Sequence, residues 1–95
     1  MSITTAPQSI MDLYADKNVI VRTVTFNYTG RLVAELRGGA LVMEDVAWIA
    51  DSGRWAKALS TGDLDEVEPY PDGQVVVSAV VDVAEWAHDL PRKTR

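Results

Sequence analysis

The chain has 95 residues, enough for one domain with a single core and too few for two. It contains no cysteine, which excludes disulfides and thiolate metal sites, and its net charge of −5 argues against general attraction to phosphate. Neither a secretory signal pattern nor an apolar run long enough to cross a bilayer is visible, so we expect a cytoplasmic protein without membrane contact.

A short helix is predicted near the start of the chain. Residues 1–8 are small and polar, without periodicity, and we expect them to form a flexible tail. Ser9 can then cap a helix in which Ile10, Leu13 and Tyr14 share one face. A helix of about two turns is marginal alone, so this face should pack on another surface.

Three strands joined by tight turns are predicted next, because the segment is rich in β-branched residues. Alternation along the first strand places Val19 and Val21 on one face, and Ile20 and Arg22 on the other. The expected strands cover 19–26, 31–36 and 40–49, with a turn or bulge at 27–30 and a turn at 37–39. The two adjacent glycines of the second turn can adopt positive φ.

A second short helix interrupts the strands. We expect it over residues 51–62, with Asp51 or Ser52 as its cap and Gly62 as its stop. Prolines and carboxylates dominate the stretch that follows, 63–71, which we predict to be an exposed acidic loop.

Two more strands, 75–77 and 80–86, complete the predicted sheet, and the basic end of the chain, 92–95, is expected to be a flexible tail. The first of these strands is apolar on both faces, whereas a strand with one exposed face should alternate. We therefore expect it to pair with the last strand of a neighbouring subunit, and head-to-tail pairing of this kind can close into a ring. The candidate oligomer interface consists of Val75, Val76, Val77, Val81 and Val83.

This order of elements resembles the Sm-like fold: a small, strongly bent, five-stranded barrel of the SH3-like kind, with an N-terminal helix. Gly30 matches the glycine near the start of the family's second strand, and Gly38 and Gly39 match its next turn. The words "VRTVT", "AWIADSGRWAKAL", "EVEPYP" and "EWAHDLP" are similar to those of small Sm-like proteins encoded in phage and prophage genomes. The likeness covers Lys17 to Pro91 and implies a single Sm-like domain over 1–95, with the second helix inserted between strands three and four.

The resemblance implies a ring-forming structural or scaffold protein, located in the host cytoplasm or, if it is a phage component, in the virion. RNA-binding members carry an Arg-Gly pair between their last two strands, where this chain has Ser78 and Ala79, so tight RNA binding is not expected. The alternative is a divergent nucleic-acid-binding ring that uses another surface. Its candidate residues are Arg22, Arg31, Arg37, Arg54 and Lys57.

Of the three tryptophans, Trp48, Trp55 and Trp86, the second has two open interpretations. With Leu59 it lies on the apolar face of the inserted helix, which packs either on its own barrel or on a protein partner. We therefore take these two residues as a candidate partner interface.

Catalytic and metal sites are not expected. His88 is the only histidine and has no evident nucleophile to activate. The acidic run "DLDEVE" lacks the central glycine and the spaced terminal glutamate of a calcium loop. The sequence therefore predicts neither an enzyme nor a cofactor.

Overall fold

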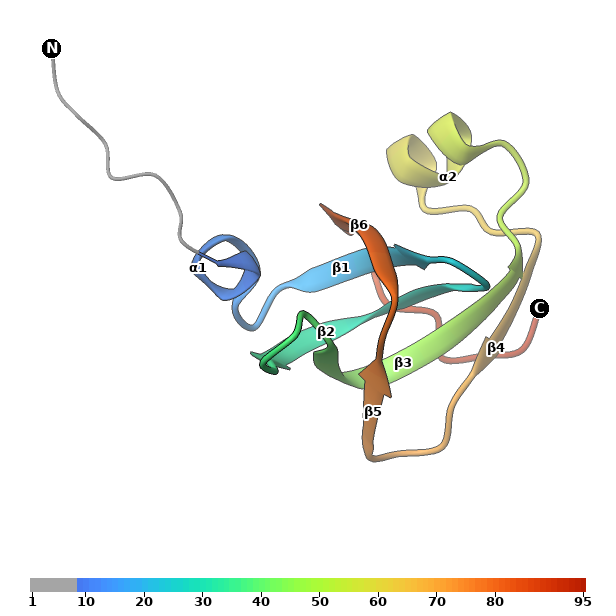
Figure 1. Ribbon diagram of the computed structural model, residues 1–95. Coiled ribbons are helices and arrows are strands. Elements are labelled where there is room, and N and C mark those ends of the chain that lie inside the picture. Colours follow the sequence, from blue (N-terminus) through green and yellow to red (C-terminus); the bar gives the residue numbers. More distant parts are fainter. Residues whose placement is uncertain (1–8) are drawn as a thin grey trace, which may run out of the picture.

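The computed structural model describes residues 9–95, so the tail expected over residues 1–8 lies outside the described residues. Six antiparallel strands form one sheet, accompanied by two short helices (Figure 1). The strands are β1 Asn18–Thr23, β2 Asn27–Glu35, β3 Leu41–Asp51, β4 Glu66–Pro69, β5 Gln74–Val77 and β6 Val80–Glu85; the helices are α1 Ile10–Tyr14 and α2 Trp55–Thr61. The mainly β class is confirmed, and α2 lies, as predicted, between β3 and β5, which correspond to the expected third and fourth strands.

The sheet is bent but does not close into a barrel. Its strand order is β4-β3-β2-β1-β6, and β5 also pairs with β3. The first half of β3 pairs with β5 and the second half with β4. Between these halves Asp45 has a φ of 53°, and the register with β2 shifts opposite Gly30. The prediction of a five-stranded barrel is therefore wrong in its strand count, and the sheet keeps two open edges.

The turn between β1 and β2 falls earlier than predicted. Thr23 ends β1, and its Oγ1 accepts hydrogen bonds from the backbone N–H groups of Phe26 at 2.9 Å and Thr25 at 3.3 Å. These local bonds prevail over the β propensity of the segment and end the strand. Gly30 instead lies within β2, where an added Cβ would come within 2.8 Å of the Met43 Cε atom. Residues 27–30 were expected to form either a turn or a bulge, and the register shift opposite Gly30 supports the bulge.

Apolar side chains form a core on each face of the sheet. The first core contains Val19, Val21, Leu32, Leu41, Met43, Val46 and Val77, and the second contains Ile20, Ala47, Ile49, Ala58, Leu64, Val67 and Trp86. Alternate residues of β1 therefore face opposite cores, which confirms the predicted alternation. The helix α1 packs at the edge of the first core through Ile10 and Tyr14, and Ser9 caps it by accepting a hydrogen bond from the Asp12 N–H.

The helix α2 covers the second core. It ends at Gly62, which has the expected left-handed conformation with a φ of 80°. The predicted caps are wrong, because Arg54 occupies the N-cap position without a side-chain cap bond. The Asp51 carboxylate accepts a hydrogen bond from the Gly53 N–H at 2.8 Å, and Ser52 donates to the carbonyl of Gly53. Asp51 still belongs to β3, so its side chain closes the strand-to-helix turn and cannot reach the first helical N–H groups.

The exposed loop predicted up to Pro71 is wrong in part, because β4 lies inside it. Val67 is buried in the second core, whereas Glu66 and Glu68 on either side are exposed. This alternation is typical of a short strand with one buried face. Pro69 is the last residue of the strand, and at this position the lack of a backbone N–H in proline removes little of the hydrogen bonding of the sheet.

The end of the chain lies against the outer side of β4. Val67 and Arg95 exchange two backbone hydrogen bonds, with N···O distances of 2.9 and 2.8 Å. Arg92 also approaches the carbonyl oxygens of Val46 and Tyr70. The structure thus gives residues 92–95, expected to be a free tail, a place on the sheet. No helix within residues 9–95 is long and apolar enough to cross a membrane.

Candidate functional site

The five valines of the predicted oligomer interface divide into two groups. Val76 on β5 and Val81 on β6 are 58% and 60% exposed. Val77 is buried in the first core, and Val75 and Val83 pack against it. The doubly apolar strand thus has one face on the core and one in solvent.

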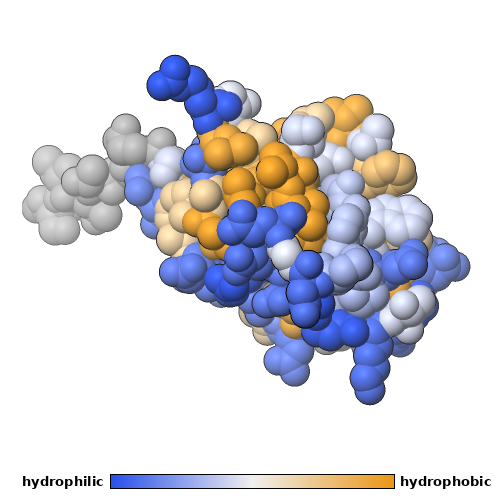
Figure 2. Space-filling view, turned by 90° about the horizontal axis from the view of Figure 1, so that it is seen from below, coloured by the Kyte–Doolittle hydropathy of each residue, from blue (hydrophilic) through white to orange (hydrophobic). Residues whose placement is uncertain are grey.

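The strands β5 and β6 are each paired on one side only. β5 pairs with β3, and β6 pairs with β1, which leaves two edges free within the described part of the chain. Ser78 and Ala79 join the two strands, and the Ala79 carbonyl accepts a hydrogen bond from the Val24 N–H at 3.1 Å. Viewed from the side on which β5 lies in Figure 1, apolar side chains form a patch bordered by polar ones (Figure 2). Unpaired edges with exposed apolar side chains are suited to pairing with another chain.

The candidate partner interface, Trp55 and Leu59, packs from α2 against the second core, and both side chains stay partly exposed. The guanidinium of Arg22 lies 5.0 Å from the centre of the Trp55 ring. These contacts fix the indole on its own sheet and leave its outer side in solvent.

Two of the five basic candidates are engaged in ion pairs. Arg22 binds Asp82 on the neighbouring strand, with 2.9 Å between Nε and Oδ1. The hydrogen bond between them raises the pKa of Arg22 and lowers the pKa of Asp82. Arg31 binds Glu44 at 2.5 Å, and a hydrogen bond from Gln74, together with this arginine, lowers the pKa of Glu44.

Of the three remaining basic candidates, Arg37 lies far from Arg54 and Lys57. Arg37 belongs to the β2–β3 turn, before β3 begins, whereas Arg54 and Lys57 lie beyond its other end, at and within α2 (Figure 1). With a rise of about 3.3 Å per residue, the 11 residues of β3 separate these positions by most of the length of the sheet. One chain therefore does not gather the five basic residues into a single surface.

His88 has a structural environment. Its Nε2 atom lies 2.8 Å from the Leu59 carbonyl oxygen, and its ring packs edge-on against Trp86 at 4.9 Å between centroids. It also sits directly against Gly62, where an added Cβ would come within 2.8 Å of the imidazole. The histidine thus ties the end of α2 to the segment after β6. Within residues 9–95, no cluster of three or more side chains suited to a metal ion is present.

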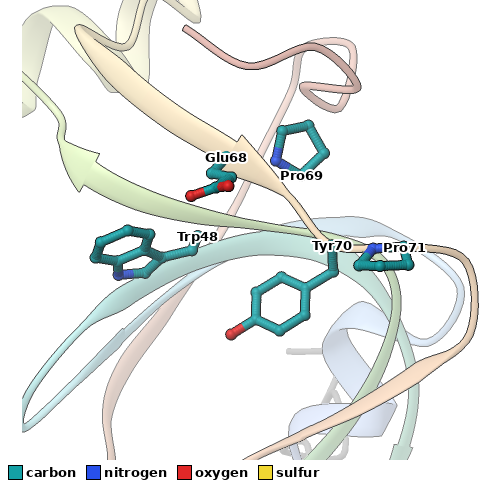
Figure 3. Close-up of a pocket in the computed structure, with 5 residues that line it drawn as sticks. All are labelled: Trp48, Glu68, Pro69, Tyr70 and Pro71. Carbon is teal, nitrogen blue, oxygen red and sulfur yellow. The ribbon is translucent and has the colours of Figure 1, made fainter.

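Sequence reasoning missed a pocket on the sheet face opposite the second core. Trp48, Glu68, Pro69, Tyr70 and Pro71 line a cavity of about 260 Å³, which we call the aromatic pocket (Figure 3). The pocket exists because Trp48 on β3 lies opposite Glu68 on β4. The sequence signal was the word "EPYP", but only this strand pairing brings it beside the tryptophan.

Two further aromatic residues contact side chains that line the aromatic pocket. Phe26 packs edge-on against Trp48 with 5.6 Å between ring centroids, and Tyr28 lies 6.3 Å from Tyr70. Burial and the neighbouring Tyr70 raise the pKa of Tyr28. The indole N–H of Trp48 is buried and has no hydrogen-bond partner among residues 9–95.

Comparisons with known protein families and with curated proteins find no match to this chain.

Proposed function

We propose that the chain is an Sm-like domain of phage origin that assembles into a homo-oligomeric ring and acts as a structural or scaffold module. The observation that carries the proposal is the pair of half-paired strands, β5 and β6, with Val76 and Val81 exposed on them. Support for the Sm-like assignment comes from the last two strands, which a two-residue turn joins and which pair with β3 and β1 respectively.

The proposed contact joins β5 of one subunit to β6 of the next. Such pairing would satisfy the free backbone N–H and C=O groups of both edges and continue the sheet across the interface. It would also cover the exposed valines, and full burial of such a side chain contributes about 1.5–3 kcal/mol. Because the two edges differ, the contact is head-to-tail, and it gives a ring when the rotation closes.

Protein contacts are the proposed role of the ring in the host cytoplasm or the virion. The partly exposed Trp55 and Leu59 on α2 support this choice, because α2 is presented away from β5 (Figure 1). The alternative of a nucleic-acid-binding ring has weaker support. Arg22 and Arg31 are neutralised by carboxylates, and the chain is acidic.

Blocking one edge at a time tests the assembly. We expect light scattering with size-exclusion chromatography to find an oligomer for the native chain, and monomers for Val76→Lys and for Val81→Lys, because a buried lysine opposes pairing. Leu13→Lys on α1, a residue that is 48% exposed and belongs to neither edge strand, is the matched control and should keep the native oligomer.

Mixing the two monomeric variants separates a head-to-tail contact from a symmetric one. Each variant retains one intact edge, and the two intact edges are complementary, so an equimolar mixture should give a dimer and nothing larger. A symmetric β5–β5 contact would instead survive Val81→Lys. That result, or a monomeric native chain at micromolar concentration, would contradict the proposed ring.

A further inference from the structure

The outer edge of β4 is covered by a segment of the same chain. β4 stands at one end of the strand order, and among the strands of residues 9–95 it pairs only with β3. On its other side the Val67 N–H donates to the Arg95 carbonyl oxygen, and the Arg95 N–H donates to the Val67 carbonyl oxygen. Such a two-way exchange is the hydrogen-bonded pair of an antiparallel ladder. Residues 92–95, which we call the terminal strap, therefore continue the sheet beyond β4 (Figure 1).

Arg92 holds the other end of the terminal strap. Its guanidinium donates to the carbonyl oxygens of Val46 at 3.5 Å and Tyr70 at 3.4 Å, and it lies 3.6 Å from the Asp72 carboxylate. Tyr70 comes directly after β4 and Arg92 begins the terminal strap, as an antiparallel arrangement requires. One side chain thus ties the terminal strap to β3 and to the connection that follows β4.

The terminal strap is held by few contacts. Hydrogen-bonded pairs recur at every second residue of an antiparallel ladder, so the next pair would join Pro69 to Lys93. Pro69 has no N–H to donate, so a second two-way exchange cannot form there. A cavity of about 380 Å³ also lies between the terminal strap and the core residues Leu64 and Val67. A segment with so few contacts should open far more often than the whole domain unfolds.

An open β4 edge would be complementary to itself. The N–H and C=O groups of Val67 both point away from β3, because both bind Arg95 in the closed state. In an antiparallel pair of two β4 strands, each Val67 would offer the other the same donor and acceptor that Arg95 offers. Unpaired strand edges readily pair with another chain, and native proteins cover such edges with loops. A second copy of this chain therefore fits the edge when the terminal strap leaves it.

We propose that the terminal strap is a cover that keeps the β4 edge closed to a second copy of the chain, with Arg92 as its fastening. When the terminal strap lifts, the β4 strands of two copies pair with Val67 opposite Val67. The closed cover leaves β5 and β6 as the strands open to pairing. The β4 edge lies at the opposite end of the strand order from β6, so this cover works in a monomer as well as in a ring.

Hydrogen exchange of the Val67 N–H, measured by nuclear magnetic resonance of the full chain, tests the cover. Arg95→Pro removes the N–H that binds the Val67 carbonyl oxygen, so exchange at Val67 should accelerate about tenfold or more. Arg95→Gln removes the same charge but keeps the N–H, and exchange should stay within about twofold of the native rate. The N–H of Val21, on β1 between β2 and β6, reports unfolding of the whole domain and should not change.

A second pair of variants tests the fastening. Arg92→Gln should accelerate exchange at Val67 about three- to tenfold, because it removes the charged donor that binds two carbonyl oxygens. Lys93→Gln removes the same charge from the next residue, whose side chain makes no ion pair within residues 9–95. This control should exchange as the native chain does.

Light scattering tests what the cover prevents. The background is the chain with Val76→Lys and Val81→Lys, which blocks the proposed β5–β6 contact and leaves β4 unchanged. In this background Arg95→Pro should form dimers as the protein concentration rises, whereas Arg95→Gln should not. If the background itself stays oligomeric, the proposed β5–β6 contact fails. The gain in mass of Arg95→Pro over Arg95→Gln still tests the cover in that case.

Three results would overturn the proposal. Equal exchange at Val67 in Arg95→Pro and Arg95→Gln would mean that the terminal strap does not hold the edge. Equal acceleration at Val67 and Val21 would make the terminal strap a part of the overall stability and not a cover that opens by itself. Faster exchange at Val67 without a gain in mass would show that an open β4 edge does not pair with a second copy.

Discussion

Thr29 is a polar residue that lies buried beside residues of the second core. It is fully buried in β2, between Ile20 and Ala47 of the neighbouring strands, and its hydroxyl has no hydrogen-bond partner among the described residues. A buried hydroxyl without a partner costs about 1–3 kcal/mol, whereas a methyl group in the same place costs nothing of this kind.

Thr29→Val is therefore expected to stabilise the protein, by about 1 kcal/mol, because it replaces the unsatisfied hydroxyl with a methyl group of similar size. Urea unfolding followed by circular dichroism measures the change, with Thr25→Val on the exposed turn as the control, expected within about 0.5 kcal/mol of the native chain. A lower stability for Thr29→Val would mean that the hydroxyl has an acceptor.

At the scale of elements, Arg22 and Asp82 join β1 to the edge strand β6. The hydrogen bond from Arg22 lowers the pKa of Asp82 below its usual value, so the folded state binds a proton less readily than the unfolded state. The stability that this pair contributes is present above the unfolded-state pKa of Asp82 and is lost as the pH falls through the lowered pKa.

We expect the drop in the urea midpoint between about pH 7 and about pH 3 to be smaller in Asp82→Asn than in the native chain. Arg22→Gln should show the same reduced drop, because it removes the group that lowers the pKa of Asp82. Part of the drop should persist in both variants, since Glu44 also has a lowered pKa through Gln74 and Arg31. An unchanged drop in both variants would show that the ion pair does not contribute to stability.

Elements defined by local chemistry were predicted closely. The strand expected at 75–77 is β5 at Gln74–Val77, and the turn at 37–39 contains two glycines with φ near 90°, as adjacent glycines favour. The misses depended on contacts that local patterns do not contain. Residues around Val67 form β4 because Val67 is buried between β3 and the end of the chain. The neighbouring prolines and carboxylates are typical of an exposed loop, so the sequence does not indicate this burial.

The candidate site was predicted in the same uneven way. The apolar run around Val76 indicates a strand with an apolar outer face, and the structure leaves that valine in solvent. The aromatic pocket was missed because Trp48 lies on β3 and Tyr70 directly follows β4, and the pairing of these two strands is not recognisable from the sequence. The basic residues were grouped by charge, whereas the length of β3 separates Arg37 from Arg54 and Lys57.

At the scale of the whole molecule, one strand supports both cores. Val19 and Val21 of β1 face the first core, and Ile20 between them faces the second. Loss of packing in the first core would displace the backbone of β1, which also carries Ile20 of the second core. The two cores should therefore unfold as one cooperative unit, although the sheet does not close.

Leu32→Ala tests this coupling from the first core, in which Leu32 is fully buried. Truncation of a buried leucine costs about 2–5 kcal/mol, so the urea midpoint should fall. We expect the fluorescence of Trp86, a probe in the second core measured with Trp48 and Trp55 replaced by phenylalanine, to show the same lowered midpoint as far-ultraviolet circular dichroism. Ile49→Val, which shortens a side chain of the second core, should lower both midpoints by a smaller and equal amount, because this change costs about 0.5–1.5 kcal/mol. If Leu32→Ala lowers the circular dichroism midpoint while Trp86 keeps its native transition, the two cores unfold separately, and β1 does not couple them.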